Sequence, residues 1–409
     1  MNNLNTNDKK ALFASIFASG LDDLNVMFLS FTLGSIISHL GLTGVAGGWI
    51  STITNLGMLA GGLVFGVLAD RYNKFKVFKL TILVFSIATG MIFFTESIGY
   101  LYLMRFIAGI GVGGQYGVAI SIMGGIVPAN KLGRVSSLNG IMGQVGSIGS
   151  AMLASLIAPY FGWKGLFLFG LLPILFVTWM HFAIDEDNIT DRGAHQTTND
   201  KKERASISEL FANKKLAHQT IALMVMTTVQ IAGYFGLMNW LPTMMQRSLD
   251  IEASSNIWMV STILGMCVGM LVFGNILDYF GPRLAYGIFL ICSMLSVFFF
   301  TYVNSMTSLL IGGAIMGFFV NGMFSGYGAI CTRLYPHHIR TIANNTILNV
   351  GRAVGGFSSV VIGFILDNSG VSQVMMFIAS LYIISFLAMI SIPALRKKDY
   401  AATGLLSVK

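Results

Sequence analysis

The chain has 409 residues, of which 55% are hydrophobic and only 10% are charged, and its formal net charge is +8. So little polar surface cannot cover a water-soluble protein of this size, so the composition excludes a soluble globular domain and predicts an all-α membrane protein. The positive charge follows the distribution expected for membrane loops and does not indicate nucleic-acid binding.

Apolar stretches long enough to span a membrane, about 20 residues each, recur along the whole chain. They lie near residues 11–37, 45–69, 77–95, 100–127, 136–158, 164–184, 217–244, 256–277, 285–303, 307–331, 342–366 and 372–394. The first is too long and too interrupted by acidic residues to be a cleavable signal sequence, so we expect it to be retained. The sequence therefore predicts about twelve transmembrane helices. They form an N-terminal six-helix bundle over 1–184 and a C-terminal bundle over 216–409, joined by a flexible linker over 185–215.

Lysine and arginine residues predict the orientation. If the N-terminus lies inside, nearly all of the 25 fall on the cytoplasmic side. The exceptions are Lys164 and Arg247, which fall outside, and Arg105 and Arg352, which lie within spans. The positive-inside rule therefore places both termini and the linker in the cytoplasm, and the chain in the cell inner membrane as a multi-pass protein.

A repeated motif indicates that the chain was built from two halves. The first copy contains Gly66, Asp70 and Arg71, and a weaker copy contains Asp278 and Arg283, about half a chain length later. Each aspartate is expected where a span reaches water, where it can cap or pair with neighbouring helix ends and cations. We expect these five residues to form a motif that acts in conformational change, because secondary transporters use two halves in parallel order.

The first copy of this motif also resembles a known family signature. Residues 66–74 are similar to the signature between the second and third helices of the major facilitator superfamily, with Asn73 where glycine is usual. Finer similarity lies in residues 105–117, 239–242, 334–340 and 351–352. These segments resemble the branch of proton symporters for organic acids, including aromatic acid, lactate or sialate, and nicotinate carriers. The resemblance implies the twelve-helix major facilitator fold and proton-coupled uptake of a small carboxylate by alternating access.

The chain also departs from this branch at three places. Gln115 stands where the fourth helix often has glutamate, and Arg333 stands where an acid often precedes Leu-Tyr-Pro. The aromatic-acid carriers commonly show Asp-Gly-x-Asp in the first helix, whereas this chain has Ser19-Gly-Leu-Asp22. These departures concern the proton site more than the fold.

Charged side chains within predicted spans are the main site candidates. They are Asp22, Asp23, Arg105 and Arg352. Each costs about 2.5–3.5 kcal/mol on insertion scales, so such groups usually face a cavity and serve a function. Neighbouring residues on a helix diverge by about 100°, so one of the two aspartates is expected to face the central cavity and the other an adjacent helix.

Each of these charges has a functional and a structural interpretation. Asp22 matches the family position for a proton-binding carboxylate, and the alternative is a structural partner for Arg105 or for a helix end. Asp23 has the same two interpretations. Arg105 lies near the outer surface, where it is expected to couple with the first-helix acids or support an outer gate. Arg352 lies near mid-membrane and is expected to bind the substrate carboxylate in a bidentate fork, or to form a structural ion pair.

Neutral polar side chains within the spans are predicted to complete the substrate site. They are Gln115, Tyr116, Gln230, Tyr234, Asn239, Asn321 and Tyr327. Such side chains also join helices inside membranes, which is the alternative for each of them. Glycines at 143, 146 and 149 are expected to let helix backbones approach closely.

The sequence is less consistent with three other functions. Proton-exchange efflux of drugs or metabolites is the nearest alternative, but the fifth span lacks the Gly-Pro motif common in such antiporters, with no proline before Pro159. A non-transporting sensor would be expected to carry an appended domain. An enzyme is not expected, because no His, Cys or carboxylate cluster has catalytic or metal spacing. We therefore expect a monomeric carrier for a small organic acid, with protons as the coupling ion and no cofactor or metal.

Overall fold

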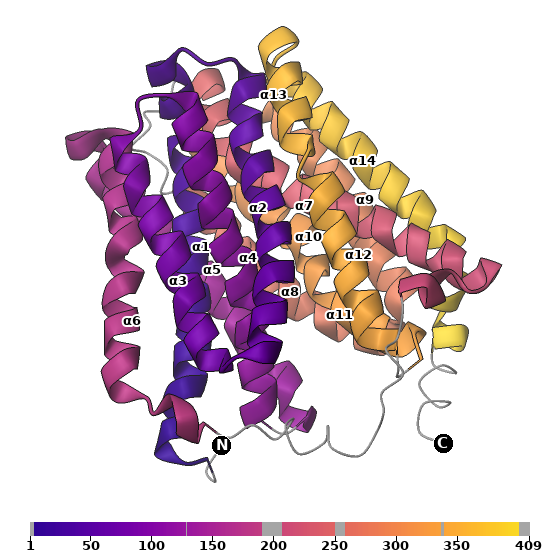
Figure 1. Ribbon diagram of the computed structural model, residues 1–409. Helices are drawn as coiled ribbons and strands as arrows, with labels where there is room; N and C mark the ends of the chain where they lie inside the picture. Colours follow the sequence, from indigo (N-terminus) through magenta and orange to yellow (C-terminus); the bar gives the residue numbers. More distant parts are fainter. Residues whose placement is uncertain (1–3, 128, 190–206, 250–257, 337–338, 401–409) are drawn as a thin grey trace. The chain divides into compact units, whose positions relative to one another are not determined.

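The computed structural model describes residues 4–127, 129–189, 207–249, 258–336 and 339–400, and these residues form helices joined by short turns (Figure 1). They fall into two compact units. Unit 1 contains Met1–Leu42, Trp49–Lys201 and Glu252–Ile257, and unit 2 contains Thr43–Gly48, Lys202–Ile251 and Trp258–Lys409.

The helices of the first half follow the predicted apolar stretches. They are α1 (Thr6–Leu40), α2 (Gly44–Arg71), α3 (Lys74–Met91), α4 (Ile98–Ile126), α5 (Ala129–Leu168) and α6 (Leu172–Ala183). Polar caps mark several of their ends: the side chains of Asn5, Asn73 and Ser97 accept hydrogen bonds from the first backbone N–H groups of α1, α3 and α4. Gly41 ends α1 in the left-handed region at φ 61°, where glycine is favoured.

The count of spanning helices differs from the prediction. Within the described ranges, 11 helices are long and apolar enough to cross a membrane, against the twelve predicted. One of them, Leu138–Ala183, is 46 residues long and contains both predicted stretches 136–158 and 164–184. As one straight helix it would be roughly 69 Å long, about twice the bilayer core. Gly162 interrupts it with φ 64° and ψ −176°, outside the helical region.

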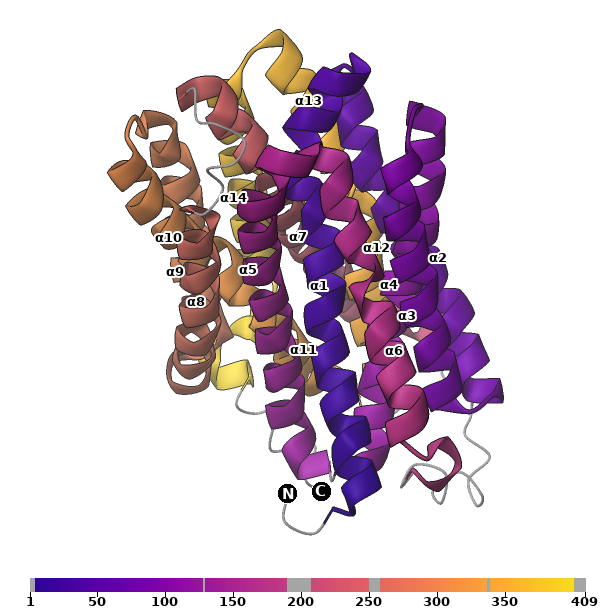
Figure 2. The ribbon, with the colours of Figure 1, turned by 90° about the vertical axis from the view of Figure 1, so that its left-hand side faces the viewer.

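Glycine pairs allow helices of unit 1 to touch backbone to backbone. Figure 2 shows α1 and α5 side by side, and no side chain could fit at Gly146, because its Cβ would overlap the carbonyl of Gly20. The same holds for α2 and α4, where Gly61 lies against the carbonyl of Ile110. These contacts explain why glycines recur in the spans.

Unit 2 contains mostly shorter helices than unit 1, and two interrupted spans. Its helices are α7 (Lys214–Leu249), α8 (Met259–Phe280), α9 (Pro282–Phe299), α10 (Met306–Gly322), α11 (Gly326–Leu334), α12 (Arg340–Gly355), α13 (Ser358–Asn368) and α14 (Val371–Ser391). The predicted span 307–331 is α10 and α11 with a 3₁₀ turn between them, and 342–366 is α12 and α13. At the start of α13, Ser358 donates to the carbonyl of Ala232, and Trp240 donates to Ser359 over 2.7 Å, which holds α13 against α7.

The predicted linker 185–215 is anchored at both of its described ends. Residues Asp185–Asn188 accept hydrogen bonds from Asn7 of α1 and from Asn73, which precedes α3. Residues Ile207–Phe211 form a 3₁₀ turn on unit 2, where the hydroxyl of Thr220 donates to the carbonyl of Leu210 over 3.2 Å. Residues 190–206 lie outside the described part of the chain.

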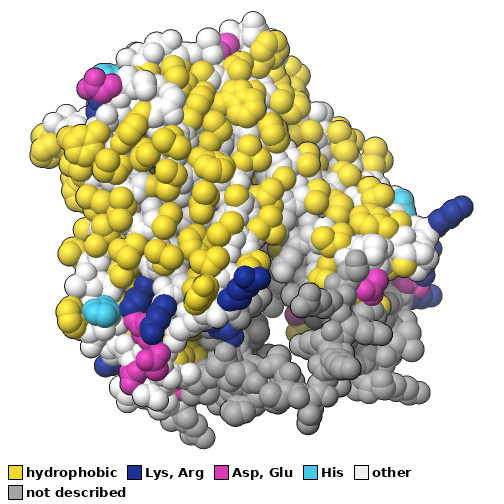
Figure 3. Space-filling view, in the orientation of Figure 1, with side chains coloured by type: hydrophobic (Ala, Val, Ile, Leu, Met, Phe, Trp, Pro, Cys, Tyr) yellow, Lys and Arg dark blue, Asp and Glu magenta, His cyan; other side chains and the backbone are white. Residues whose placement is uncertain are grey.

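The surface agrees with a protein that lies in lipid. In Figure 3 hydrophobic side chains form a broad band over the helices of unit 1, and charged side chains gather at one end. Large apolar side chains are openly exposed, among them Leu175 at 70% and Phe182 at 83%. Such a band is normal only against a membrane or a partner.

Candidate functional site

The two aspartates of α1 lie near the middle of this 35-residue helix. Asp22 is buried, with 7% of its surface exposed. Asp23 is partly buried, and its carboxylate lies directly against Gly143 of α5, where a Cβ would overlap it. Asp23 therefore meets an adjacent helix, and Asp22 points in a different direction, since consecutive residues diverge by about 100°.

Polar contacts continue along the seam between α1 and α5. One turn before the aspartates, the hydroxyl of Ser19 donates to the side-chain carbonyl of Asn139 on α5 over 2.6 Å. Together with the close approach at Gly20, this bond fixes the register of the two helices. The carboxylate of Asp23 therefore sits at a rigid junction.

Arg105 bonds to a neighbouring helix and not to the aspartates of α1. Its side chain is 2% exposed, and its Nε–H donates to the hydroxyl of Thr54 on α2 over 3.2 Å. Among the residues that the structure describes, the ion pairs do not include Arg105. The expected coupling of Arg105 with the first-helix acids is therefore not a direct ion pair in this structure.

Among the described residues of unit 1, Gln115 is the buried amide with neither polar atom hydrogen-bonded. It is fully buried on α4, and neither its amide nitrogen nor its amide oxygen has a hydrogen-bond partner in the described structure. A buried polar group left without a partner costs about 1–3 kcal/mol. A bound polar molecule would remove this cost, so Gln115 is the strongest candidate of unit 1 for a ligand contact. Its neighbour Tyr116 is 45% exposed.

Three further buried amides of unit 1, not singled out from the sequence, have a side-chain oxygen without a partner. The side-chain oxygens of Asn25 on α1, Asn55 on α2 and Gln144 on α5 accept no hydrogen bond in the described residues. Their exposed fractions are 1%, 3% and 6%. An amide within an otherwise apolar span is the signal that could have identified them.

Two of the predicted site residues of unit 2 bind neighbouring helices. The amide nitrogen of Gln230 on α7 donates to the carbonyl of Val320 on α10 over 2.8 Å. The hydroxyl of Tyr327 on α11 donates to the carbonyl of Met226 on α7 over 3.1 Å. Each side chain is 1% exposed. In this structure both serve helix packing, the alternative that the sequence left open.

Arg352 lies in the last turn of α12 and is partly buried. Glycines on both sides of it seat α12 on α7: a Cβ on Gly351 would lie 2.9 Å from the hydroxyl of Thr227, and one on Gly355 would lie 2.7 Å from the carbonyl of Thr228. The position of the Arg352 backbone is thus set by close packing. Two further candidates, Asn239 at 3% and Asn321 at 4% exposure, are buried in α7 and α10.

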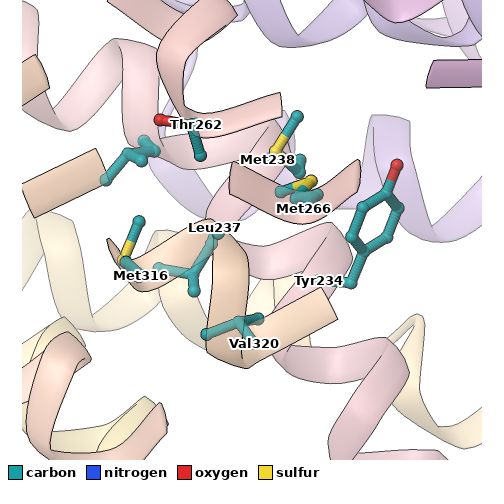
Figure 4. Close-up of a pocket in the computed structure, with 9 residues that line it drawn as sticks. Tyr234, Leu237, Met238, Thr262, Met266, Met316 and Val320 are labelled. Atoms are coloured by element: carbon teal, nitrogen blue, oxygen red, sulfur yellow. The ribbon is translucent and has the colours of Figure 1, made fainter. Parts of the chain in front are cut away.

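A small pocket within unit 2 is mainly apolar. Figure 4 shows Met238, Met266 and Met316 around it, with Tyr234 at one side. The remaining lining residues are Leu237, Leu241, Thr262, Gly317 and Val320. The hydroxyl of Thr262 lies against Gly313 of α10, which makes it part of the packing between helices. The pocket therefore offers apolar contacts and no charged group to bind an anion.

The predicted conformational motif is found at two helix ends. Gly66 and Arg71 are exposed near the end of α2, and the side chain of Asp70 lies outside the described part of the chain. In the second copy Asp278 is exposed, and the guanidinium of Arg283 donates to the carbonyl of Ile390 on α14 over 3.0 Å. The second copy therefore binds the end of the last helix of its own unit.

With the helical fold and its buried charges described, comparison with known proteins identifies the family. The sequence matches the Major Facilitator Superfamily over residues 13–263 and 223–405. The chain belongs to this superfamily. It is therefore a secondary transporter and not an enzyme.

Individual relatives agree with this assignment. The chain is 33% identical to a putative metabolite transport protein of Haemophilus influenzae, over 97% of this chain and 99% of the relative. It is 27% identical to a cis,cis-muconate transport protein of Acinetobacter baylyi, over 74% of each chain. The resemblance to the organic-acid branch is thereby confirmed at the level of distant homology.

Solved structures show the same fold. The xylose transporter of Escherichia coli, in an inward-open conformation, matches with a TM-score of 0.75 at 15% identity, covering 97% of this chain and 98% of that one. At this identity the likeness concerns the fold alone.

Proposed function

We propose that the protein takes up a small organic anion together with protons, by alternating access between two six-helix bundles. The proposed architecture has twelve spans, because the 46-residue run Leu138–Ala183 counts as two helices that meet at Gly162. The proposed location is the cell inner membrane with both termini in the cytoplasm, as the lysine and arginine distribution predicts. The proposed working unit is the monomer.

The observation that carries this proposal is the burial of Asp22 in the middle of a spanning helix. A carboxylate at this depth costs about 2.5–3.5 kcal/mol and persists where it has a function. In the proposal Asp22 binds and releases the coupling proton. Asp23 supports it from the rigid seam with α5. Arg105 contributes only indirectly, because its hydrogen bond is to Thr54 on α2.

The substrate carboxylate is assigned to Arg352. A guanidinium presents two parallel N–H donors that match the two oxygens of a carboxylate, which the single ammonium of lysine cannot do. The buried amide of Gln115, with its unused hydrogen-bonding capacity, is assigned to a second polar group of the acid. Tyr116, Tyr234, Asn239 and Asn321 are further candidates for such contacts. Similarity to a muconate transport protein supports an organic acid as the substrate class.

The proposed cycle moves two opposite charges together. The proton on Asp22 and the anion on Arg352 cross in the same step, which reduces the net charge carried through a region where an isolated ion is prohibitively costly. The carrier returns only after both have left. This requirement couples the acid to the proton gradient.

Uptake of a panel of labelled acids into proteoliposomes, with and without an imposed pH gradient, tests the proposal. We expect accumulation of at least one carboxylate when the gradient is present, and loss of this accumulation in Asp22→Asn. Glu96→Gln is the matched control, because it removes an exposed carboxylate outside the spans. Gradient-driven accumulation that survives in Asp22→Asn would show that the proton role is misassigned. Accumulation that appears only with the gradient reversed would indicate efflux by exchange.

A further inference from the structure

The chain that leaves α6 does not start as a free linker. Residues Asp185–Asn188, here called the strap, dock on the first turn of α1 (Figure 1). The backbone N–H of Asp185 donates to the side-chain oxygen of Asn7 over 2.9 Å. The side-chain nitrogen of Asn7 donates back to the carbonyls of Asp185, over 2.8 Å, and Asn188, over 3.3 Å. One amide side chain on α1 therefore satisfies three backbone groups of the strap.

A second amide joins the strap to the loop between α2 and α3. The side-chain oxygen of Asn73 accepts from the backbone N–H groups of Phe75 and Lys76, over 2.9 and 3.2 Å, and so caps α3. Its side-chain nitrogen donates to the carbonyl of Glu186 over 3.0 Å. Asn73 is the residue at which the motif departs from the usual glycine, and glycine could supply neither contact. The departure is explained by a double role, as helix cap and as strap contact.

Charges of opposite sign complete this contact. Lys79 of α3 pairs with Glu186, and both side chains are mostly buried, at 13% and 11% exposure. A second pair, Lys76 with Asp187 at 3.6 Å, is largely exposed and contributes little. The ammonium of Lys10 on α1 donates to the carbonyl of Ala183, the last residue of α6, over 3.0 Å. Basic residues on α1 and α3 thus meet an acidic strap and the carbonyl end of α6.

We propose that the strap is a permanent clasp, which makes the adjoining ends of α1, α3 and α6 move as one body when the transporter changes conformation, and that Asn73 is its central contact. A rocking mechanism needs rigid halves. Apart from the strap, the polar contacts of α6 at this end, among the described residues, are those of Lys10 with the carbonyl of Ala183 and of Lys79 with His181. All of these contacts lie within unit 1. The inference rests on the fold and is independent of the cargo assigned above.

One substitution at Asn73 separates the clasp from the helix cap. Asn73→Asp keeps a good capping oxygen but loses the donor to Glu186 and places a negative charge beside an acidic segment. We expect Asn73→Asp to speed amide hydrogen exchange of the peptide that contains Asp185 and Asp187, and to lower the melting temperature in detergent by about 2–5 °C. Asn304→Asp, an exposed loop substitution in unit 2, controls for the change of charge. Wild-type exchange and melting in Asn73→Asp would show that Asn73 is only a cap, and the clasp would be refuted.

A disulfide tests whether the clasp is permanent. The variant Asn7→Cys/Asp185→Cys replaces the amide contact with a covalent one, and each single-cysteine variant serves as a control. We expect the oxidised double variant to form the disulfide and to transport the panel's best acid at the rate of its reduced form. Loss of transport on oxidation, restored by reduction, would show that the strap must open. Failure of the thiols to join would contradict the contact itself. If no acid in the panel is transported, hydrogen exchange and melting still decide whether the clasp exists.

Discussion

Gln115 on α4 and Gln230 on α7 are both buried glutamines in spanning helices, one in each unit, yet they are placed differently. The amide nitrogen of Gln230 donates to the carbonyl of Val320 and so joins two helices, and only its amide oxygen lacks a partner in the described residues. Gln115 has no hydrogen-bond partner for either amide atom in the described residues. A buried glutamine thus joins two helices in unit 2, whereas in unit 1 its side chain makes no hydrogen bond. Residue type alone does not separate a packing residue from a ligand contact, whereas the accounting of hydrogen bonds does.

Replacement of Gln115 by leucine gives the sharpest test of this difference. If its amide serves a polar ligand, Gln115→Leu should lower the uptake rate by roughly tenfold, because a polar group of the bound acid left without its hydrogen bond costs about 1–3 kcal/mol. The melting temperature should not fall, because the variant buries no unsatisfied amide. Uptake assays and thermal unfolding on the same preparation check both. Unchanged uptake with higher stability would make Gln115 a mere packing residue.

Arg352 tests whether unit 2 also contributes a ligand contact. Arg352→Lys keeps the charge but loses the bidentate fork, so we expect the KM for the acid to rise by about tenfold, with little change in folding. Concentration-dependent uptake measures KM, and Arg396→Lys on the exposed segment after α14 is the control. An unaltered KM would remove Arg352 from the substrate site.

Gln230 and Tyr327 should behave as packing residues. Gln230→Leu would leave the carbonyl of Val320 without its donor, and Tyr327→Phe would do the same to Met226, at about 1–3 kcal/mol each. We expect melting temperatures to fall by a few degrees. The KM of the protein that still folds should be that of the wild type. A raised KM at normal stability would return these two residues to the substrate site.

The smallest effect is expected from pH at the strap. A hydrogen bond from the side chain of Asn188, and then one from the backbone N–H of Asp187, lower the pKa of Asp185 below its usual 3.8. Because the folded pKa is the lower one, this stabilisation is present above pH 3.8 and is lost as the pH falls through the folded value. Melting curves of wild type and Asp185→Asn should therefore converge in acid. A constant difference across that range would exclude this contribution.

The positions of the helices could be predicted from the sequence, because a span must be apolar over a fixed length wherever it occurs. The break at Gly162 falls in the gap between the predicted spans 136–158 and 164–184. The turn between α10 and α11 could not be predicted, since it does not break the apolar pattern. Buried charges were identifiable by their cost in lipid, so Asp22 and Arg105 were found. The partner of Arg105 was not, because Thr54 lies on another helix and no local spacing connects the two.

The strap is a second feature whose contacts could not be predicted from the sequence. Its composition is that of a flexible linker, which is what the sequence predicts. Its structure depends on Asn7 and Asn73, which lie more than a hundred residues away and bond to its backbone. In the sequence, Asn73 stands out only as a departure from the motif. A hydrogen bond between a side chain and a distant backbone group produces no periodic pattern in the sequence, so the sequence does not predict it.

The crossing of α1 and α5 at Gly20 and Gly146 has a mechanical consequence. Where side chains separate two helices, a small displacement of one can be absorbed by rotamer changes in the layer between them. At this crossing no layer of side chains separates the helices, because the two backbones are in direct contact. A displacement of α5 is therefore transmitted directly to α1 near the carboxylate of Asp23. A tilt of either helix changes the surroundings of this acid.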